Sequence, residues 1–340
     1  MRPLWRGKSA ETWQVRGTVR CSCDTRPVRA VVIDAPGPPD VLRVSEIPPP
    51  VRSSGCAAVT IEAAGVNPVD MGNRRNPAWA GIDAPYVVGY EFAGDITWID
   101  ADATDLRIGD RVWGLLPVRG TRWGAYAEEI AVPHGLLAPR PAALSSIEAA
   151  ALPLAGATAL QTLDRLRLSP GNWLLVHGAS GGVGHLLVQL AVACGLSVAA
   201  ASRPDDRQRL IDLGVNVWLD RAVESVPAAA AAELGHGFDA VVDLVGGQIL
   251  PTLPFIVERG QAATIVDLDG NFDEAIDRNI SIHGVLMRPG RGVLDRLREA
   301  VDKGLRPHVK HVWPLAEAVM AHRRLEAGRV GGKIVLSMTG

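Results

Sequence analysis

The stretch WLLVHGASGGVG, from Trp173 to Gly184, joins an apolar run to three glycines with the spacing G-x-x-G-x-x-G. An apolar helical pattern follows directly, from Val183 to Cys194. A buried strand, a tight glycine turn and a helix in this order predict the first unit of a doubly wound parallel α/β sheet of the Rossmann type.

The glycine turn predicts a ligand as well as a fold. Because glycine has no side chain, the backbone can turn tightly and approach a bound group, and the helix N-terminus behind it favours an anion. An empty turn of the same shape is the alternative, but strand, glycines and helix in register favour the pyrophosphate of a nicotinamide dinucleotide. The expected contacts are Gly178, Ala179, Ser180, Gly181, Gly182, Val183 and Gly184.

Downstream of this turn, strands and helices alternate with the spacing of βαβ units. Near-continuous apolar runs, typical of strands buried on both faces, predict the rest of the sheet. These predicted strands are residues 197–201, 217–219, 238–245, 262–267 and 281–287, with a helix at 205–213.

Upstream of the turn, from Val28 to about Pro139, short β-type runs alternate with Gly and Pro. This pattern is typical of an all-β, barrel-like unit. A Ser145–Glu148 capping box predicts a helix at 147–152. After about residue 289 the pattern predicts helices at 292–303 and 315–327 and a closing strand at 333–336.

Composition gives no reason to expect a nucleic acid or a membrane as partner. The 340 residues are 47% hydrophobic and 21% charged with a net charge of −2, and the most apolar stretch, 186–201, is too short and too interrupted to span a bilayer. We interpret the basic pairs Arg74–Arg75 and Arg323–Arg324 as solvated surface.

The N-terminal stretch and the cysteines bear on location. Residues 1–27 carry several arginines without the apolar core of a signal peptide. We predict a poorly ordered extension or a start site assigned too early, with a transit peptide as the alternative. The spacings of Cys21, Cys23, Cys56 and Cys194 suit neither a zinc site nor a redox motif. Free thiols in a reducing, cytoplasmic compartment are therefore expected.

The end of the second βαβ strand indicates which dinucleotide binds. An NAD-selective site places an acid about 20 residues beyond the glycines, against the ribose hydroxyl. Here the strand ends in Ser202 and Arg203, and a guanidinium suits a 2′-phosphate. We therefore predict NADPH, although Asp205 and Asp206 lie close enough to weaken the argument.

Several separated motifs resemble the medium-chain dehydrogenase/reductase superfamily, specifically its zinc-free quinone oxidoreductase-like branch. They are AAGVNPVD (63–70), VGYEFAG (88–94), GDRV (109–112), GAYAE (124–128), the glycine turn and GKIVL (332–336). The resemblance implies a GroES-like substrate domain formed by residues 28–150 and 289–340, with a Rossmann domain at 151–288 inserted between them. It also implies a homodimer.

The resemblance bears on the metal as well. Zinc-dependent members have Cys at the position of Asn67 and Gly-His-Glu where this chain has Gly89-Tyr90-Glu91. A zinc site needs about three protein ligands, and this chain lacks the family's set. Without that Lewis acid, we expect hydride delivery from NADPH to an acceptor that is already electrophilic: a quinone, or the C=C bond of an α,β-unsaturated carbonyl.

The remaining candidate site residues also follow from the resemblance. Asn67 corresponds to a residue near the nicotinamide ribose or a substrate oxygen, and Asp70 is expected to orient its loop; both form the predicted catalytic pair. The non-catalytic alternatives are a turn residue for Asn67 and a capping or surface residue for Asp70. Four further residues complete the predicted cofactor-binding set: Thr158, Arg221, Val245 and Lys333. Thr158 could instead be a helix residue bonded to its own backbone, and Arg221 a solvated residue.

One departure from the family leaves the proton donor open. Many quinone reductases have a Tyr where this chain has Gly72, so solvent is the expected proton source. Trp79 and Trp123 could line a substrate pocket, although core positions are favoured for large aromatics, and His177 and His185 are expected to be structural. A pathway-specific tailoring reductase and a non-catalytic NADPH-binding protein are the alternative functions.

Overall fold

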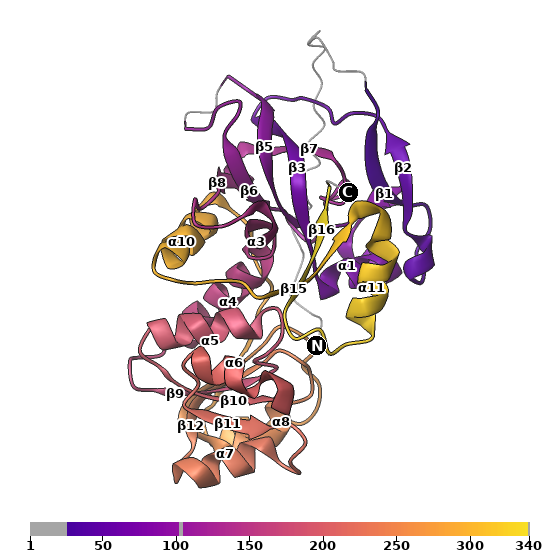
Figure 1. The fold of residues 1–340 in the computed structure, drawn as a ribbon. Helices are drawn as coiled ribbons and strands as arrows, with labels where there is room; N and C mark the ends of the chain where they lie inside the picture. The colour runs from indigo at the N-terminus through magenta and orange to yellow at the C-terminus, as the bar shows by residue number, and fades with distance from the viewer. Residues whose placement is uncertain (1–25, 102–104, 339–340) are drawn as a thin grey trace, which may run out of the picture.

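The computed structural model describes residues 26–101 and 105–338, and Figure 1 shows their arrangement. A β-rich part carries most of the first half of the chain, and a parallel sheet with helices on its faces forms the other part. The predicted extension falls almost wholly outside the described residues, as do Cys21 and Cys23. Cys56 and Cys194 are free thiols.

The parallel sheet has six strands in the spatial order β11-β10-β9-β12-β13-β14, and every neighbouring pair is parallel. The order reverses between β9 and β12, which is where a doubly wound sheet opens a crevice at the carboxyl ends of its strands. The strands are β9 (Trp173–His177), β10 (Ser197–Ser202), β11 (Val217–Asp220), β12 (Phe238–Asp243), β13 (Ile256–Thr264) and β14 (Ser281–Gly284). The predicted Rossmann sheet is thus confirmed.

Helices join and cover these strands. They are α4 (Pro153–Leu166), α5 (Gly184–Ala193), α6 (Arg207–Asp212), α7 (Val226–Leu234), α8 (Ile249–Thr252) and α9 (Asp273–Asp277). The predicted helix at 205–213 is instead a 3₁₀ turn at Pro204–Asp206 followed by α6 at Arg207–Asp212. Helix α7 was not predicted, since its Ala-rich sequence has little amphipathic periodicity.

The β-rich part holds a seven-stranded sheet, β15-β16-β3-β5-β6-β8 with β7 paired to β3, and a three-stranded sheet, β2-β1-β4. Their strands are β1 (Val28–Ile33), β2 (Arg43–Ile47), β3 (Cys56–Val66), β4 (Tyr86–Val87), β5 (Glu91–Ile99), β6 (Arg111–Leu115), β7 (Glu129–Pro133), β8 (Leu137–Pro139), β15 (Val309–Pro314) and β16 (Lys333–Ser337). The other helices are α1 (Pro68–Arg75), α2 (Pro77–Ala80), α3 (Ser146–Ala150), α10 (Arg291–Asp302) and α11 (Ala318–Glu326).

Strand β16 brings the C-terminal part of the chain back to the first part. It pairs antiparallel with β3, with Ile334 opposite Val66. Lys333, at the start of β16, therefore lies beside the turn that follows β3. None of the described helices is long and apolar enough to cross a membrane.

Two predictions about individual side chains are wrong. Arg74 is fully buried rather than solvated, because it meets Glu326 and His322 of α11, and a buried guanidinium is stable when it is paired. Trp79 and Trp123 are exposed by 43% and 45% instead of lying in the core. Each ring packs beneath an arginine, Arg119 and Arg122 respectively.

Candidate active site

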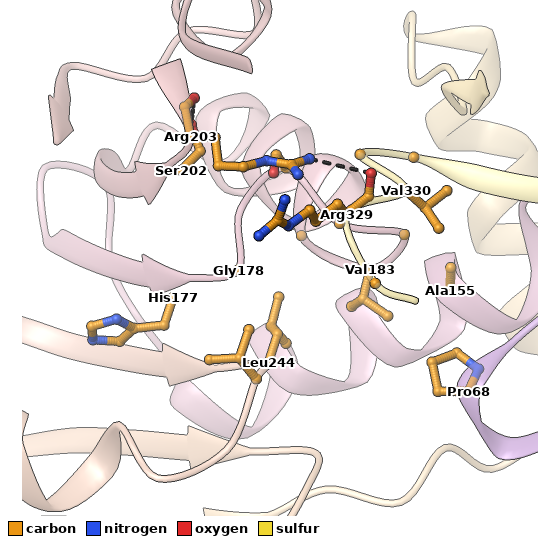
Figure 2. Close-up of a pocket in the computed structure, with 18 of the residues that line it drawn as sticks. Pro68, Ala155, His177, Gly178, Val183, Ser202, Arg203, Leu244, Arg329 and Val330 are labelled. Carbon is orange, nitrogen blue, oxygen red and sulfur yellow. Dashed lines mark hydrogen bonds between the residues drawn. The ribbon is translucent and has the colours of Figure 1, made fainter. Parts of the chain in front are cut away.

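One cavity of about 830 Å³ lies between the carboxyl ends of the parallel strands and the C-terminal segment that leads into β16. Figure 2 shows it: Arg203 and Arg329 lie near each other, Pro68 lies at the other end, and Gly178 and Val183 of the glycine turn lie between them. Its volume falls in the range of cofactor pockets. The lining contains the glycine turn, the ends of β10 and β12, the Asn67 turn and residues 328–334.

The glycine turn has the shape that a dinucleotide phosphate requires. Gly178 has φ of +82°, which favours glycine, and its carbonyl accepts from the Gly181 N–H at 3.0 Å. A Cβ on Gly184 would lie 2.2 Å from that carbonyl, so the first turn of α5 packs directly on the loop. The backbone therefore reaches the cavity wall without side chains in between, and α5 begins at the wall.

His185 holds this turn in place. Its Nδ1 faces the Gly181 carbonyl at 2.7 Å and its Nε2 faces the His308 N–H at 2.9 Å. The proton is therefore on Nδ1, and burial lowers the pKa of His185 to about 3, which keeps the ring neutral. The structural role predicted for His185 fits these contacts.

A basic end of the cavity lies beyond β10. Ser202, Arg203 and Arg221 all line it, as does Arg329 of the C-terminal segment, which sequence reasoning missed. Arg203 extends toward Arg329 and donates to its carbonyl at 3.3 Å (Figure 2). Two of these guanidinium groups thus come from opposite walls, one from the sheet and one from the segment before β16.

Asp206 does not offer a free carboxylate at this end. Burial alone would raise its pKa, but hydrogen bonds from Arg209 and Ser180 and the charges of Arg209 and Arg203 hold the pKa below the usual value. Arg209 donates to Asp206 at 2.9 Å and also to the Ser180 and Gly331 carbonyls at 3.1 Å each. Asp206 is therefore occupied in joining the glycine turn to the C-terminal segment.

The opposite end of the cavity is formed by Asn67 and Lys333, with Glu91 directly behind them. The Asn67 Nδ2 donates to Glu91 Oε1 at 2.7 Å, and the Lys333 Nζ donates to Asn67 Oδ1 at 2.5 Å and to Glu91 Oε1 at 2.7 Å. All three side chains are buried. The other Glu91 oxygen accepts from the Leu154 N–H at 2.7 Å.

This triangle fixes which way the Asn67 amide points. Reversing the amide would set its NH₂ against the Lys333 ammonium and its oxygen against the Glu91 carboxylate, and neither contact is a hydrogen bond. One Nδ2 hydrogen serves Glu91, and the second is not used in the triangle. Since Asn67 lines the cavity, this second hydrogen is the candidate donor to a group bound at this end.

Asp70 lies beneath the Asn67 turn, outside the cavity lining. It is fully buried, and its Oδ2 accepts from the Asn67 N–H at 2.6 Å at the start of α1. Burial raises the pKa of Asp70 to about 7, although hydrogen bonds from Asn67 and Tyr126 lower it in part. Its geometry fits the orienting role rather than contact with a substrate.

The remaining predicted residues divide between the cavity and its surroundings. Val245 lines the cavity, whereas Ala179 is buried behind the turn. Thr158 is outside the lining and donates to the Leu154 carbonyl at 2.8 Å, as a helix threonine does. The missed residue Arg329 lies in a GRVGGK stretch whose glycines give a loop signal, but nothing local indicates which site that loop reaches.

Comparisons with known proteins agree with this architecture. Residues 53–142 match the model of the alcohol dehydrogenase GroES-like domain, and residues 213–336 match that of the zinc-binding dehydrogenase family. The chain is 31% identical to 2-methylene-furan-3-one reductase of Solanum lycopersicum, over 88% of this chain and 76% of that protein. It is 28% identical to the chloroplastic NADPH-dependent alkenal/one oxidoreductase of Arabidopsis thaliana, over 96% and 85%.

A solved structure has the same fold as this chain. The quinone oxidoreductase from Coxiella burnetii superposes with a TM-score of 0.83 at 28% identity, covering 92% of this chain and all of that one. This chain belongs to the medium-chain dehydrogenase/reductase superfamily. It is a quinone oxidoreductase-like member with a GroES-like domain and a Rossmann-type sheet, so it is an oxidoreductase that uses a nicotinamide cofactor.

In this oxidoreductase, Asn67 and Tyr90 stand at the positions where the resemblance gives zinc-dependent members a Cys and a His. Within residues 26–101 and 105–338, no three His, Cys, Asp or Glu side chains gather as a metal site requires. The Glu91 carboxylate is paired with the Lys333 ammonium, and the Tyr90 hydroxyl accepts from Asn73 away from the cavity.

Proposed function

We propose that this protein is an NADPH-dependent reductase that delivers hydride, without zinc, to a quinone or to the C=C bond of an α,β-unsaturated carbonyl. The observation that supports it is a single cavity with a basic end, a glycine turn in the middle and an oriented amide donor at the other end. A dinucleotide laid along the turn would place its adenosine and nicotinamide halves at these two ends.

NADPH rather than NADH is proposed because of the charges at the basic end. Arg203, Arg329 and Arg221 all line this end of the cavity. The buried carboxylate beside them, Asp206, is hydrogen-bonded to Arg209 at 2.9 Å and lies 3.7 Å from Arg203, so three guanidinium groups meet one occupied carboxylate. A doubly charged 2′-phosphate between two guanidinium groups makes charge-assisted hydrogen bonds. A bare ribose hydroxyl would leave the two arginines repelling each other.

The proposed class of hydride acceptor follows from the Asn67 end of the cavity. When bound, the reduced nicotinamide would supply a hydride, and the Asn67 N–H that Glu91 does not use would donate to the acceptor's carbonyl oxygen. That hydrogen bond favours the negative charge that develops on the oxygen as hydride reaches the β-carbon. Lys333 and Glu91 hold the amide, and the proton that completes the product comes from solvent.

The test is turnover with a panel of quinones, enones and enals, using NADPH and NADH in parallel and following nicotinamide absorbance. We expect NADPH oxidation with at least one acceptor class and a preference for NADPH over NADH. Cofactor binding without turnover on any member of the panel would favour the non-catalytic NADPH-binding protein. Turnover confined to one unusual acceptor would favour a tailoring reductase.

We also propose a homodimer, from the resemblance, and a cytoplasmic location, from the free thiols expected in a reducing compartment. Light scattering of the purified protein tests the first, with a mass near twice 36.1 kDa as the expected result. Microscopy of the tagged full chain tests the second, since import into an organelle would contradict it.

A further inference from the structure

A buried row of polar side chains connects helix α11 to the Asn67 turn. Arg74 Nη1 lies 2.8 Å from His322 Nδ1, His322 Nε2 lies 3.2 Å from the Tyr126 hydroxyl, and that hydroxyl lies 3.1 Å from Asp70 Oδ2. Asp70 Oδ2 in turn accepts from the Asn67 N–H. Apart from the Asn67 backbone, none of these groups belongs to the cavity wall.

The direction of every hydrogen bond in this row is determined. Arginine has donors and no acceptor, so Arg74 must donate to His322 Nδ1. Burial, followed by the charges of Arg74 and Arg75, lowers the pKa of His322 to about 3, so the ring is neutral and its proton is on Nε2. His322 therefore donates to Tyr126, and Tyr126 donates to Asp70.

The surroundings leave these side chains little freedom. Arg74, Tyr126, His322 and Asp70 are fully buried, and the Tyr126 and His322 rings meet edge to face at 5.8 Å between centroids. A Cβ on Gly89 would lie 2.4 Å from the Tyr126 ring, so the VGYEFAG motif needs glycine there to admit the ring. Arg74 is held from its other side by Glu326 and by the Gly37 carbonyl.

The row ends on the segment that also forms the cavity wall. His322 and Glu326 lie on α11, which packs against α1, and the chain then runs through Arg329 to Lys333. Lys333 holds the Asn67 side chain while Asp70 holds its backbone N–H. Asn67 is therefore linked twice to the C-terminal segment: directly through Lys333, and indirectly through Asp70 and Tyr126 to His322.

We propose that Tyr126 and His322 are positioning residues for the reaction, which through Asp70 hold the Asn67 turn so that its amide faces the acceptor. This rests on the proposed role of Asn67 as the donor to the acceptor carbonyl. Neither residue touches the cofactor or the substrate. Their effect is on how well Asn67 is placed, and so on kcat more than on NADPH affinity.

The protonation of Asp70 makes the activity depend on pH, and a variant with a purely structural effect would not shift that dependence. Besides Asn67 and Tyr126, the Asp70 carboxyl faces Glu91 of β5, which raises the pKa of Asp70, and Lys333 of β16, which lowers it. The other titratable or charged groups around it are Tyr90, His322 and Arg74. With a pKa about 7, the ionised carboxylate, which is the stronger acceptor for the Asn67 N–H, predominates only above that pH. Activity is therefore expected to rise with pH through about 7.

The experiment compares Tyr126→Phe with Tyr90→Phe. Both tyrosines are fully buried, and each variant removes only the hydroxyl. The Tyr126 hydroxyl accepts from His322 and donates to Asp70, whereas the Tyr90 hydroxyl accepts from Asn73 and does not contact Asp70. We expect Tyr126→Phe to lower kcat about tenfold, the value of one hydrogen bond of ~1.4 kcal/mol. The NADPH dissociation constant should stay within twofold. The pH midpoint should move upward, because Asp70 loses a donor that favours its charged form.

A second pair of variants tests the next link. His322→Gln can accept from Arg74 and donate to Tyr126, so it should retain activity, whereas His322→Leu breaks the row and should resemble Tyr126→Phe. The Asp70 carboxyl is also titrated by infrared difference spectroscopy, wild type against Asp70→Asn, which needs no turnover. An unchanged midpoint in Tyr126→Phe, or a kcat equal to that of Tyr90→Phe, would overturn the proposal. Absence of turnover in the wild type would instead overturn the proposed function, with the infrared midpoint still deciding the inference.

Discussion

The two ends of the cavity are constructed in opposite ways. At the basic end, Arg203 and Arg329 come from loops, and the Arg203 guanidinium makes two long contacts, 3.3 Å to the Arg329 carbonyl and 3.7 Å to the Asp206 carboxylate. At the other end, Asn67, Lys333 and Glu91 are buried and bonded to one another. The difference implies that cofactor selectivity can change with little effect on folding, whereas the Asn67 end links chemistry and stability.

The largest effect is expected on stability, from Lys333→Met. Removing the ammonium leaves the Glu91 carboxylate buried without its cation, which costs about 3–5 kcal/mol of unfolding free energy. Urea denaturation measures it, with Lys303→Met at an exposed position as control. Adding Glu91→Gln should recover much of the loss, and a loss below about 1 kcal/mol would show that the triangle is not a buried ion pair.

The glycine turn is expected to show the next largest effect, on NADPH binding. In Gly184→Ala the new Cβ would lie 2.2 Å from the Gly178 carbonyl and 2.7 Å from the Ala179 Cα, so the backbone of the turn must shift. We expect NADPH affinity to fall by about 100-fold, or ~2.7 kcal/mol, with lost phosphate contacts. Fluorescence titration measures it. Gly135→Ala, where a Cβ meets nothing within 4 Å, is the matched control.

The glycine turn and the sheet could be predicted because their signals are local. The apolar run at 173–177 and the glycines after it define a strand and a turn in any context. The burial of Arg74 could not be predicted, since its partners His322 and Glu326 lie about 250 positions away in sequence. Arg329 was missed for the same reason, because only the pairing of β16 with β3 brings its loop to the site.

A smaller effect is expected at the basic end, from Arg203→Ala and Arg329→Ala. Each removes one charge-assisted hydrogen bond to a 2′-phosphate, worth about 1.5–3 kcal/mol, so NADPH affinity should fall roughly 10- to 100-fold. NADH affinity should change by less than about twofold, and folding should be unaffected. Arg43→Ala, on exposed β2, controls for net charge. Equal losses for the two cofactors would contradict the phosphate assignment.

The smallest effect is expected from Thr158→Val, which decides whether that residue belongs to the cofactor site at all. The hydroxyl donates to the Leu154 carbonyl one helical turn away, and Leu154 N–H donates to Glu91, so Thr158 supports the helix behind the triangle. Valine keeps the shape of the side chain, and the carbonyl that loses this donor still accepts within α4. NADPH affinity should therefore change by less than about twofold, with a stability loss of about 1 kcal/mol. A fall in affinity comparable to that of Arg203→Ala would instead show that the Thr158 hydroxyl contacts the cofactor. In that case the Asn67 end would also contribute to cofactor affinity, and the contrast between the two ends of the cavity would be smaller.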